Sequence, residues 1–208
     1  MSHIGFLFDL DGTLVNSKPA VERAWIQLAK EAQIPFEKMV GLHGIPGEQS
    51  LRMLMKDRDE AEIMNWVQRI EYLEMSDTDG ITAINGAKEL LSELNDKEIP
   101  WTIVTSCTIP LAKSRVKAAG IQLPHHAVTF DDVELGKPHP EPFILGAKRI
   151  GLNPNQCWAI EDAPAGVKSG KTAGCTVAAV LTSHDQTQLI EADHFLKHLD
   201  ELLPLAFN

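Results

Sequence analysis

The sequence is poor in cysteine and has no long apolar segment. Its three cysteines, Cys107, Cys157 and Cys175, are widely spaced and odd in number. This pattern disfavours a disulfide framework or a zinc site and predicts reduced thiols. No apolar stretch approaches the roughly 20 residues that span a bilayer. The first residues have neither the basic segment nor the apolar core of a signal peptide, so we expect a cytoplasmic protein without a membrane partner.

Positive charge is also in deficit. The 208 residues contain 19 Lys and Arg against 29 Asp and Glu, a formal net charge of -10. That balance disfavours nucleic acid or an anionic membrane as the main partner. A small anionic substrate is not excluded, because it responds to local cations. The length and the apolar fraction of 44% fit one globular domain, or one domain with an insertion; we expect a monomer or a small homo-oligomer.

Two aspartates follow an apolar run near the N-terminus. Phe6-Leu7-Phe8 is continuous, and Asp9, Asp11 and Gly12 come directly after it. A strand buried on both faces has such a run, and ligands of open α/β sheets bind beyond the carboxyl ends of the strands. The segment therefore predicts that Asp9 and Asp11 reach a ligand site. The alternative is a hairpin or a solvated turn, because Asp-Gly between apolar residues also favours one.

Apolar periodicity divides the rest of the chain into two parts. Residues 17–80 carry only helical patterns, with helices expected over 21–32, 48–56 and 59–75 and a loop rich in Gly and Pro over 41–47. From residue 81 strands and helices alternate, with strands expected over 100–106, 127–130, 157–160 and 176–181 and helices over 87–94, 111–119, 143–150 and 165–173. Such alternation predicts an α/β fold, a parallel sheet with helices on both faces. We expect a core domain of residues 1–16 and 81–208, and a helical cap of residues 17–80 over the ligand site.

Polar residues follow three further predicted strands. They are Thr105-Ser106, then Gly136-Lys137-Pro138, then Glu161-Asp162. Taken singly, these segments also fit an ordinary strand end, a solvated turn and a capped helix start. Together with Asp9 and Asp11 they predict one edge of the sheet rich in acids, hydroxyls and a lysine.

That set of residues suits phosphoryl transfer with Mg²⁺. Clustered carboxylates repel one another unless a cation intervenes, and Mg²⁺ takes one or two of them with water and phosphate oxygens. Thr105 and Lys137 can donate to phosphate oxygens. One aspartate can attack phosphorus to give an aspartyl-phosphate, and a second can protonate the leaving oxygen and then activate water.

These segments resemble, in order and over the whole chain, the four motifs of the haloacid dehalogenase superfamily: Asp9-Leu10-Asp11-Gly12-Thr13-Leu14, Val104-Thr105-Ser106, Gly136-Lys137-Pro138 and Glu161-Asp162. The resemblance implies a Rossmann-like core, and the helical insertion is similar to one of the family's caps. Residues 19–25, 99–106 and 161–166 are most similar to bacterial sugar phosphatases, which act on hexose and hexitol phosphates. Those enzymes are related to 2-deoxyglucose-6-phosphate and glycerol-phosphate phosphatases.

The resemblance also implies a role for each acid. Asp9 is expected to be the nucleophile and a Mg²⁺ ligand. Asp11 is expected to be the general acid/base, with its backbone carbonyl on the metal. Asp162 is expected as the third protein ligand, with Glu161 either a direct ligand or a hydrogen-bond acceptor behind the ligands. A dehalogenase is disfavoured, because that branch lacks the second aspartate.

The phosphate is expected to bind to Thr105, the Ser106 backbone and Lys137. Cys107 departs from the glycine that related phosphatases often have after this Thr-Ser pair. Either its side chain narrows the phosphate loop, or it points away and acts as a small buried hydrophobe; we favour the second.

Substrate choice is expected to lie in the cap, because the core motifs contact only the phosphate. His43, Ser50 and Arg52, together with Glu48, are candidates for binding sugar hydroxyls or a remote anionic group. The alternative for each is a solvated helix face. Trp25 and Trp66 are expected to pack in the cap core and not to stack on a sugar.

The sequence therefore predicts a Mg²⁺-dependent phosphatase of small phosphorylated sugars or polyols. One alternative is a sugar phosphomutase of the β-phosphoglucomutase type, which uses the same four motifs. The other is a catalytically silent sugar-phosphate-binding protein. The intact set of Asp9, Asp11, Thr105, Lys137 and Asp162 disfavours a silent relative.

Overall fold

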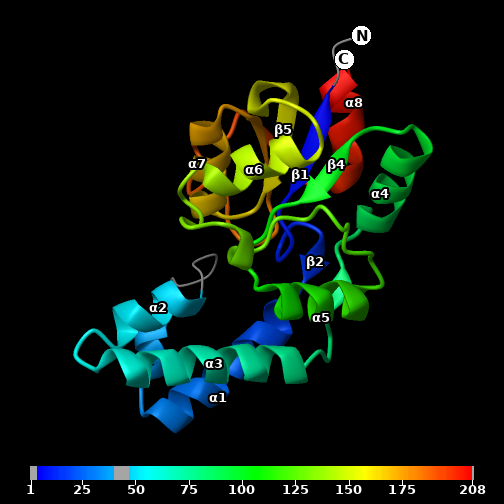
Figure 1. The fold of residues 1–208 in the computed structure, drawn as a ribbon. Helices are drawn as coiled ribbons and strands as arrows, with labels where there is room; N and C mark the ends of the chain where they lie inside the picture. Colours follow the sequence, from blue (N-terminus) through cyan, green and yellow to red (C-terminus); the bar gives the residue numbers. More distant parts are fainter. Residues whose placement is uncertain (1–3, 40–46, 208) are drawn as a thin grey trace.

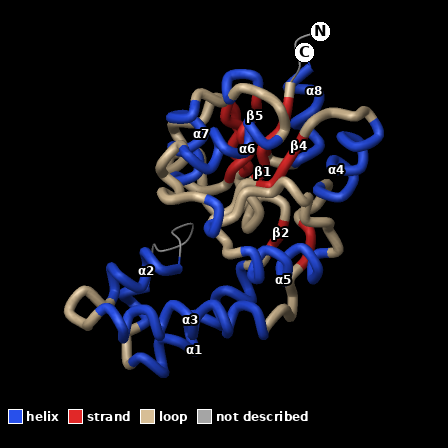
Figure 2. Tube along the Cα trace, in the orientation of Figure 1, coloured by secondary structure: helices blue, strands red, loops and turns tan. Residues whose placement is uncertain are grey.

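The computed structural model describes residues 4–39 and 47–207 of the chain. Its main sheet has five strands in the order β4-β1-β5-β6-β7, and every neighbouring pair is parallel (Figures 1 and 2). The strands are β1 (Gly5–Phe8), β4 (Trp101–Ile103), β5 (Cys157–Glu161), β6 (Thr176–Val180) and β7 (His194–Leu196). The predicted α/β fold with a parallel sheet is confirmed, and β1 is held between β4 and β5.

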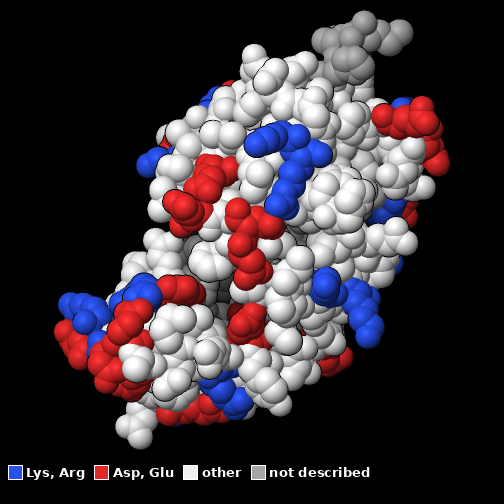
Figure 3. All heavy atoms as spheres, in the orientation of Figure 1, with Lys and Arg blue, Asp and Glu red and all other residues white. Residues whose placement is uncertain are grey.

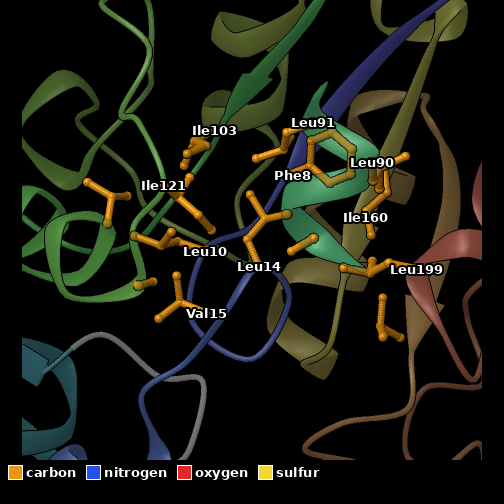
Figure 4. Close-up of a cluster of buried hydrophobic side chains, with 14 of the residues drawn as sticks. Phe8, Leu10, Leu14, Val15, Leu90, Leu91, Ile103, Ile121, Ile160 and Leu199 are labelled. Atoms are coloured by element: carbon orange, nitrogen blue, oxygen red, sulfur yellow. The ribbon is translucent and has the colours of Figure 1, made fainter. Parts of the chain in front are cut away.

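Helices cover both faces of this sheet because side chains alternate along β1. Phe6 and Phe8 belong to one buried cluster, whereas Leu7 belongs to a second cluster on the other face. The first cluster packs against α4 (Ala87–Asp96), α5 (Ile109–Ala119), η4 (Leu199–Glu201) and α8 (Leu202–Phe207). The second packs against α6 (Glu141–Arg149) and α7 (Pro164–Ala173). Figure 4 shows Phe8 and Ile160 of neighbouring strands beside Leu90 and Leu91 of α4.

The sequence analysis missed several short elements. Strand β7, η3 (Pro154–Gln156), η4 and α8 were not predicted, and neither was a two-stranded antiparallel ribbon of β2 (Val15–Asn16) and β3 (Thr82–Ala83). Because β2 pairs with β3 and not with β1, the hairpin alternative for the segment around Gly12 is wrong. The segment after β1 is a short local turn, in which the Gly12 N–H donates to the Val15 carbonyl at 2.7 Å.

The strand expected over residues 127–130 is not formed. Val128 makes a single isolated bridge with Val104, and Phe130 begins the short 3₁₀ helix η2 (Phe130–Asp132). The reason is local. The Asp132 carboxylate accepts from the Thr129 N–H at 2.9 Å, and the Thr129 side chain accepts from the Asp132 N–H. This capping box turns the chain out of the sheet.

The helices that follow β2 pack around a small core of their own. They are α1 (Lys18–Ala32), η1 (Phe36–Met39), α2 (Gly47–Leu54) and α3 (Glu60–Ser76), and the absence of a strand between residues 17 and 80 holds for the described part of that range. Leu28, Leu51 and Ile63 are buried in this core, with Trp25 and Trp66 packed at its edge, as predicted. Within residues 4–39 and 47–207, no helix has the length and apolar character needed to cross a membrane.

Candidate active site

Three carboxylates meet at the carboxyl edge of the sheet. Asp9 follows β1, whereas Glu161 ends β5 and Asp162 follows it. Because β1 and β5 are parallel neighbours in register from Gly5 to Phe8, their ends deliver these side chains to one place. Each residue offers one carboxylate oxygen, and these oxygens lie within 4.8 Å of one another. All three residues are buried.

Lys137 lies between two of these acids. Its Nζ donates to Asp9 Oδ1 and Glu161 Oε1, each at 2.6 Å, and to the Val104 carbonyl at 2.8 Å. The ammonium also faces the Phe143 ring at 5.1 Å from the ring centre. Burial by itself lowers the lysine pKa, but the two carboxylates outweigh it and hold the pKa of Lys137 above its ordinary value. The lysine is therefore a permanent cation with all three of its N–H donors used.

One ammonium does not neutralise this cluster. Burial raises the pKa of Asp9 well above its ordinary value, Lys137 offsets part of that rise, and the charges of Glu161 and Asp162 add to it. Burial and the charge of Glu161 raise the pKa of Asp162 to about 7. Such carboxylates are costly to ionise in the absence of a further cation.

Two glycines make room for the acids. A Cβ at Gly166, in the first turn of α7, would overlap the Glu161 carboxylate. A Cβ at Gly12 would overlap Asp162 Oδ2, and Gly12 also has φ of +89°, a conformation that favours glycine. The sequence analysis treated Gly12 only as a turn residue and gave Gly166 no function.

The fit at Gly166 predicts a large effect of one added methyl group. Gly166→Ala is expected to lower the catalytic activity of this site and to lower the free energy of unfolding by about 1–3 kcal/mol, since Glu161 is buried and cannot move aside. The measurement is urea unfolding together with initial rates. Gly47→Ala is the control, because its nearest atom to a new Cβ is Ile70 Cγ2 at 3.8 Å. A Gly166→Ala enzyme with wild-type rate and stability would contradict the fit.

Glu161 also organises the loop that carries Asp162. Its Oε2 accepts hydrogen bonds from the backbone N–H groups of Asp162 and Ala163, at 3.1 and 3.3 Å, while its Oε1 accepts from Lys137. Both oxygens are therefore engaged within the protein. This favours the second of the two roles expected for Glu161, a hydrogen-bond acceptor behind the metal ligands.

Asp11 points to different partners. Its Oδ2 accepts a hydrogen bond from Cys107 Sγ at 2.9 Å, and its Oδ1 lies 3.1 Å from Arg115 Nε. Burial and the nearby charge of Asp11 raise the pKa of Cys107 well above its ordinary value, so this cysteine remains a thiol that can donate. Cys107 is buried as expected, but it contacts Asp11, which the sequence analysis did not foresee; nor did it identify Arg115.

The second motif lies beside the cluster. Val104 follows β4, and its N–H donates to the Phe8 carbonyl at 2.7 Å, which places Thr105 next to the end of β1. The Thr105 hydroxyl is buried and accepts from the Cys107 backbone N–H at 3.1 Å. Ser106 is half-buried. The structure thus brings the Thr105-Ser106 segment to the same edge of the sheet as Asp9 and Lys137.

A loop after β6 supports the acids from the other side. The Thr182 hydroxyl donates to the Gly12 carbonyl, the Ser183 side chain hydrogen-bonds Asp162 and lowers its pKa, and His184 Nδ1 donates to the Asp162 carbonyl at 2.9 Å. The sequence analysis missed these residues. The same signal that located the other motifs, polar residues directly after a predicted strand, would have found them.

The cleft over this site has one wall from α2 and one from the core. It is lined by Glu48, Gln49, Arg52, Phe130, Gly136 and Lys137. Figure 3 shows this face of the molecule hollowed between the helical part and the part that carries the sheet, with acidic side chains around the hollow. The cleft therefore joins Lys137 of the acid cluster to the first turns of α2.

The predicted cap residues have different outcomes. Arg52 lines the cleft, but its guanidinium makes four hydrogen bonds of 2.6–2.9 Å to Glu48 and Glu60. Ser50, a predicted substrate-binding residue, is not among the residues that line the cleft. It is fully buried in α2, and its hydroxyl has no hydrogen-bond partner among the described residues. His43 lies outside the described residues.

Comparison with known proteins decides the family. A model of the family described as haloacid dehalogenase-like hydrolase matches residues 6–180. The chain belongs to the haloacid dehalogenase-like hydrolases. It is 48% identical to hexitol phosphatase A of Escherichia coli (strain K12), over 95% of this chain and 92% of that one. It is 32% identical to glycerol-1-phosphate phosphohydrolase 2 of Saccharomyces cerevisiae, over 97% of this chain and 85% of the relative.

A solved structure matches the fold over nearly the whole chain. The crystal structure of a hydrolase from Pseudomonas syringae superposes with a TM-score of 0.88 at 27% identity, covering 98% of this chain and 97% of that one. The four motifs that the resemblance rested on are therefore located on a haloacid dehalogenase-like core, at the edge of the sheet where the acids and Lys137 meet.

Proposed function

We propose that this hydrolase is a Mg²⁺-dependent phosphatase of small phosphorylated sugars or sugar alcohols, acting through an aspartyl-phosphate on Asp9. The observation that carries the proposal is the meeting of Asp9, Glu161, Asp162 and Lys137 at one edge of the sheet. The names of the relatives, a hexitol phosphatase and a glycerol-1-phosphate phosphohydrolase, support the substrate class. We place the protein in the cytoplasm, as a monomer or small homo-oligomer.

The donor set fits Mg²⁺. Carboxylate oxygens of Asp9, Glu161 and Asp162 converge within 4.8 Å, and the raised pKa values of Asp9 and Asp162 show that burial and mutual repulsion leave the cluster short of positive charge. Asp9, Asp162 and the Asp11 backbone carbonyl would hold the ion, with Glu161 behind them. When bound, the ion supplies positive charge to the phosphoryl oxygens.

Nucleophilic attack, phosphate binding and proton transfer are proposed for different residues of the chain. Lys137 holds Asp9 Oδ1, and among the described residues Oδ2 of Asp9 accepts no hydrogen bond, which leaves it to attack phosphorus. Thr105 and the Ser106 backbone would hold the phosphoryl oxygens, and the charge of Lys137 would neutralise them. As the bond from phosphorus to the leaving oxygen breaks, Asp11 would give that oxygen a proton. It would then take one from the water that releases phosphate from Asp9.

We propose that residues 17–80 form the cap that selects the substrate, with residues 1–16 and 81–208 as the core. The cleft supports this division, because Glu48, Gln49 and Arg52 face Lys137 across it. Glu48 and Gln49 offer hydrogen-bonding groups that suit sugar hydroxyls. Because Glu48 and Glu60 occupy most of the donors of Arg52, its role in selection is to hold Glu48 at the cleft.

A substrate panel tests the proposal. Phosphate release is measured with Mg²⁺ on hexose 6-phosphates, hexitol phosphates, glycerol phosphate and β-glucose 1-phosphate. Release from sugar or polyol monoesters supports a phosphatase. Conversion of β-glucose 1-phosphate to glucose 6-phosphate without phosphate release would establish a mutase instead. Saturable binding without turnover would establish a silent binding protein.

Arg52→Ala is expected to change the ranking of sugar phosphates. Loss of the arginine frees Glu48, and we expect kcat/KM for the preferred sugar phosphate to fall about tenfold, the size of one polar contact of about 1.4 kcal/mol. Hydrolysis of a small aryl phosphate should be nearly unchanged, because it does not reach α2. Arg69→Ala is the control, since Arg69 is a cap arginine paired with Glu31 outside the cleft. Equal losses on all substrates would show that Arg52 serves folding alone.

A further inference from the structure

Arg115 is a buried cation whose role is not explained by the sequence motifs or by the proposed metal site. It lies on α5, behind the Thr105-Ser106 segment, and is only 1% exposed. Removing a guanidinium from water is costly unless charged partners surround it, and an apolar side chain of similar size would often be no less stable. Its partners therefore indicate what the position does.

The guanidinium is shared between the core and the cap. Its Nε lies 3.1 Å from Asp11 Oδ1. Its Nη2 donates to Glu74 Oε2 at 2.9 Å, and its Nη1 donates to the Glu74 backbone carbonyl at 3.2 Å. Asp11 belongs to the loop after β1, and Glu74 belongs to the last turns of α3. The Arg115 side chain therefore joins Asp11, the expected acid/base, to the helical insertion.

Both ends of this connection are anchored. On the cap side, Glu74 Oε1 accepts from Trp25 Nε1 of α1 at 3.0 Å. On the core side, Asp11 Oδ2 accepts from Cys107 Sγ. The result is a continuous path of polar contacts from α1 to the site loop. Burial raises the pKa of Glu74 to about 7, and the Arg115 charge offsets part of that rise, which agrees with a dry environment for the pair.

The packing of α3 on α5 strengthens the connection. Besides the Arg115 contacts, the Thr108 hydroxyl donates to Glu71 on α3, and the Ser114 hydroxyl donates to the Met75 carbonyl at 3.4 Å. A shift of α3 relative to α5 therefore moves Glu74 against Arg115. The contact between Arg115 Nε and Asp11 Oδ1, by contrast, is an ion pair without a hydrogen bond. Neither atom has a hydrogen-bond partner among the described residues.

We propose that Arg115 is a positioning residue that orients the Asp11 carboxyl for proton transfer and ties that orientation to the cap through Glu74. The proposal rests on the proposed function, because Asp11 is the acid/base of that reaction. Arg115 acts through Asp11, whose Oδ1 its Nε contacts at 3.1 Å, and it transfers no proton itself.

The test separates proton transfer from the rest of the reaction by the leaving group. In the first step the bond from Asp9 oxygen to phosphorus forms while the phosphorus–oxygen bond to the leaving group breaks. An alkoxide leaving group needs the proton of Asp11, whereas 2,4-dinitrophenolate departs without one. In Arg115→Lys we expect kcat/KM for a hexitol phosphate to fall about 100-fold, the scale of a small misplacement of a catalytic group. For 2,4-dinitrophenyl phosphate we expect a change below about threefold.

A double-mutant cycle shows whether the effect passes through Asp11. In an Asp11→Asn background, Arg115→Lys is expected to cause no further loss on the hexitol phosphate, because the group it positions is gone. Equal losses on both substrates, or an unchanged loss in the Asp11→Asn background, would overturn the proposal and leave Arg115 a structural residue.

Glu74→Gln tests the cap end without removing the buried arginine. It keeps the shape of Glu74 and one of the two hydrogen bonds that its carboxylate accepts from Trp25 and Arg115, but it removes the charge. We expect the same selective loss on the hexitol phosphate, about tenfold. Glu71→Gln is the matched control, one turn earlier on α3 and bonded to Thr108. If the two variants behave alike, the coupling to the cap is overturned.

The unfolding midpoints of the same variants give a readout independent of activity. Arg115→Lys and Asp11→Asn are expected to shift the urea midpoint by less in combination than the sum of their separate shifts. Additive shifts would overturn the proposed coupling between Arg115 and Asp11. Wild-type enzyme that released no phosphate from any monoester with Mg²⁺ would instead refute the proposed function, so the two failures are distinguishable.

Discussion

Asp9→Asn is expected to abolish phosphate release, lowering kcat by about four orders of magnitude or more. The asparagine amide is a poor nucleophile, and it cannot form the acyl phosphate that the proposed mechanism needs. The measurement is phosphate release from the preferred hexitol phosphate, with enzyme at concentrations high enough to detect the residual rate.

The Asp9→Asn protein is expected to stay folded. Lys137 keeps its bonds to Glu161 and to the Val104 carbonyl, and the asparagine carbonyl can still accept from it. The variant also removes one of three crowded carboxylates. Asp57→Asn is the control, an exposed aspartate between α2 and α3, and should keep full activity. Full activity in a folded Asp9→Asn enzyme would refute the assignment of the nucleophile.

Removal of Mg²⁺ is the second change with a large expected effect. In excess EDTA, turnover of every phosphomonoester is expected to fall below detection and to return when Mg²⁺ is added in excess. The reason is the cluster of Asp9, Glu161 and Asp162, which a single ammonium leaves with uncompensated charge. Unchanged turnover in EDTA would contradict the metal site, whatever the outcome for Asp9.

Stability without metal is expected to depend on pH with a definite sign. Burial raises the pKa of both Asp162 and Glu74 to about 7, whereas in the unfolded chain these acids ionise near 3.8 and 4.5. Between about pH 4 and pH 7 the folded protein therefore holds more protons than the unfolded chain. Their contribution to the free energy of unfolding is present at low pH and is lost as the pH rises through about 7.

Mg²⁺ is expected to reverse this loss. Its ligands bind as carboxylates, so the metal competes with protons and stabilises the folded protein more at pH 8 than at pH 5. Thermal unfolding at both pH values, with Mg²⁺ and with EDTA, measures the difference. Asp162→Asn should remove most of the pH dependence of the Mg²⁺ effect, while Glu74→Gln should leave it in place. Equal Mg²⁺ effects at both pH values would contradict the raised pKa of Asp162.

Much of the fold was predictable because its signals are local. The helices predicted over 111–119 and 165–173 are each followed directly by a glycine. Gly120 and Gly174 have the left-handed conformation that ends α5 and α7. The failures have equally local causes. The segment at 127–130 has strand-like composition, but the side chain of Thr129 bonds to Asp132 and turns the chain.

The residues at the edge of the sheet were predictable for a different reason. Parallel strands end at the same edge, so polar residues directly after strands converge regardless of their distance in the sequence. This is why Asp9, Thr105 and Asp162 were identified together. Lys137 was placed at this edge because it follows the strand predicted over 127–130. That strand does not form, yet the loop that carries Lys137 still reaches the cluster.

The sequence by itself determined the fold class, the helical insertion and the acids at the sheet edge, because each depends on short-range periodicity or on residues next to strand ends. Only the tertiary structure decided the rest. It buried Ser50, paired Arg52 with two glutamates, and placed Arg115 between Asp11 and Glu74. Arg52 and Glu48 are four residues apart on α2, a spacing visible in the sequence. The other contacts join separate elements, and no local pattern encodes them because they depend on how the helices pack.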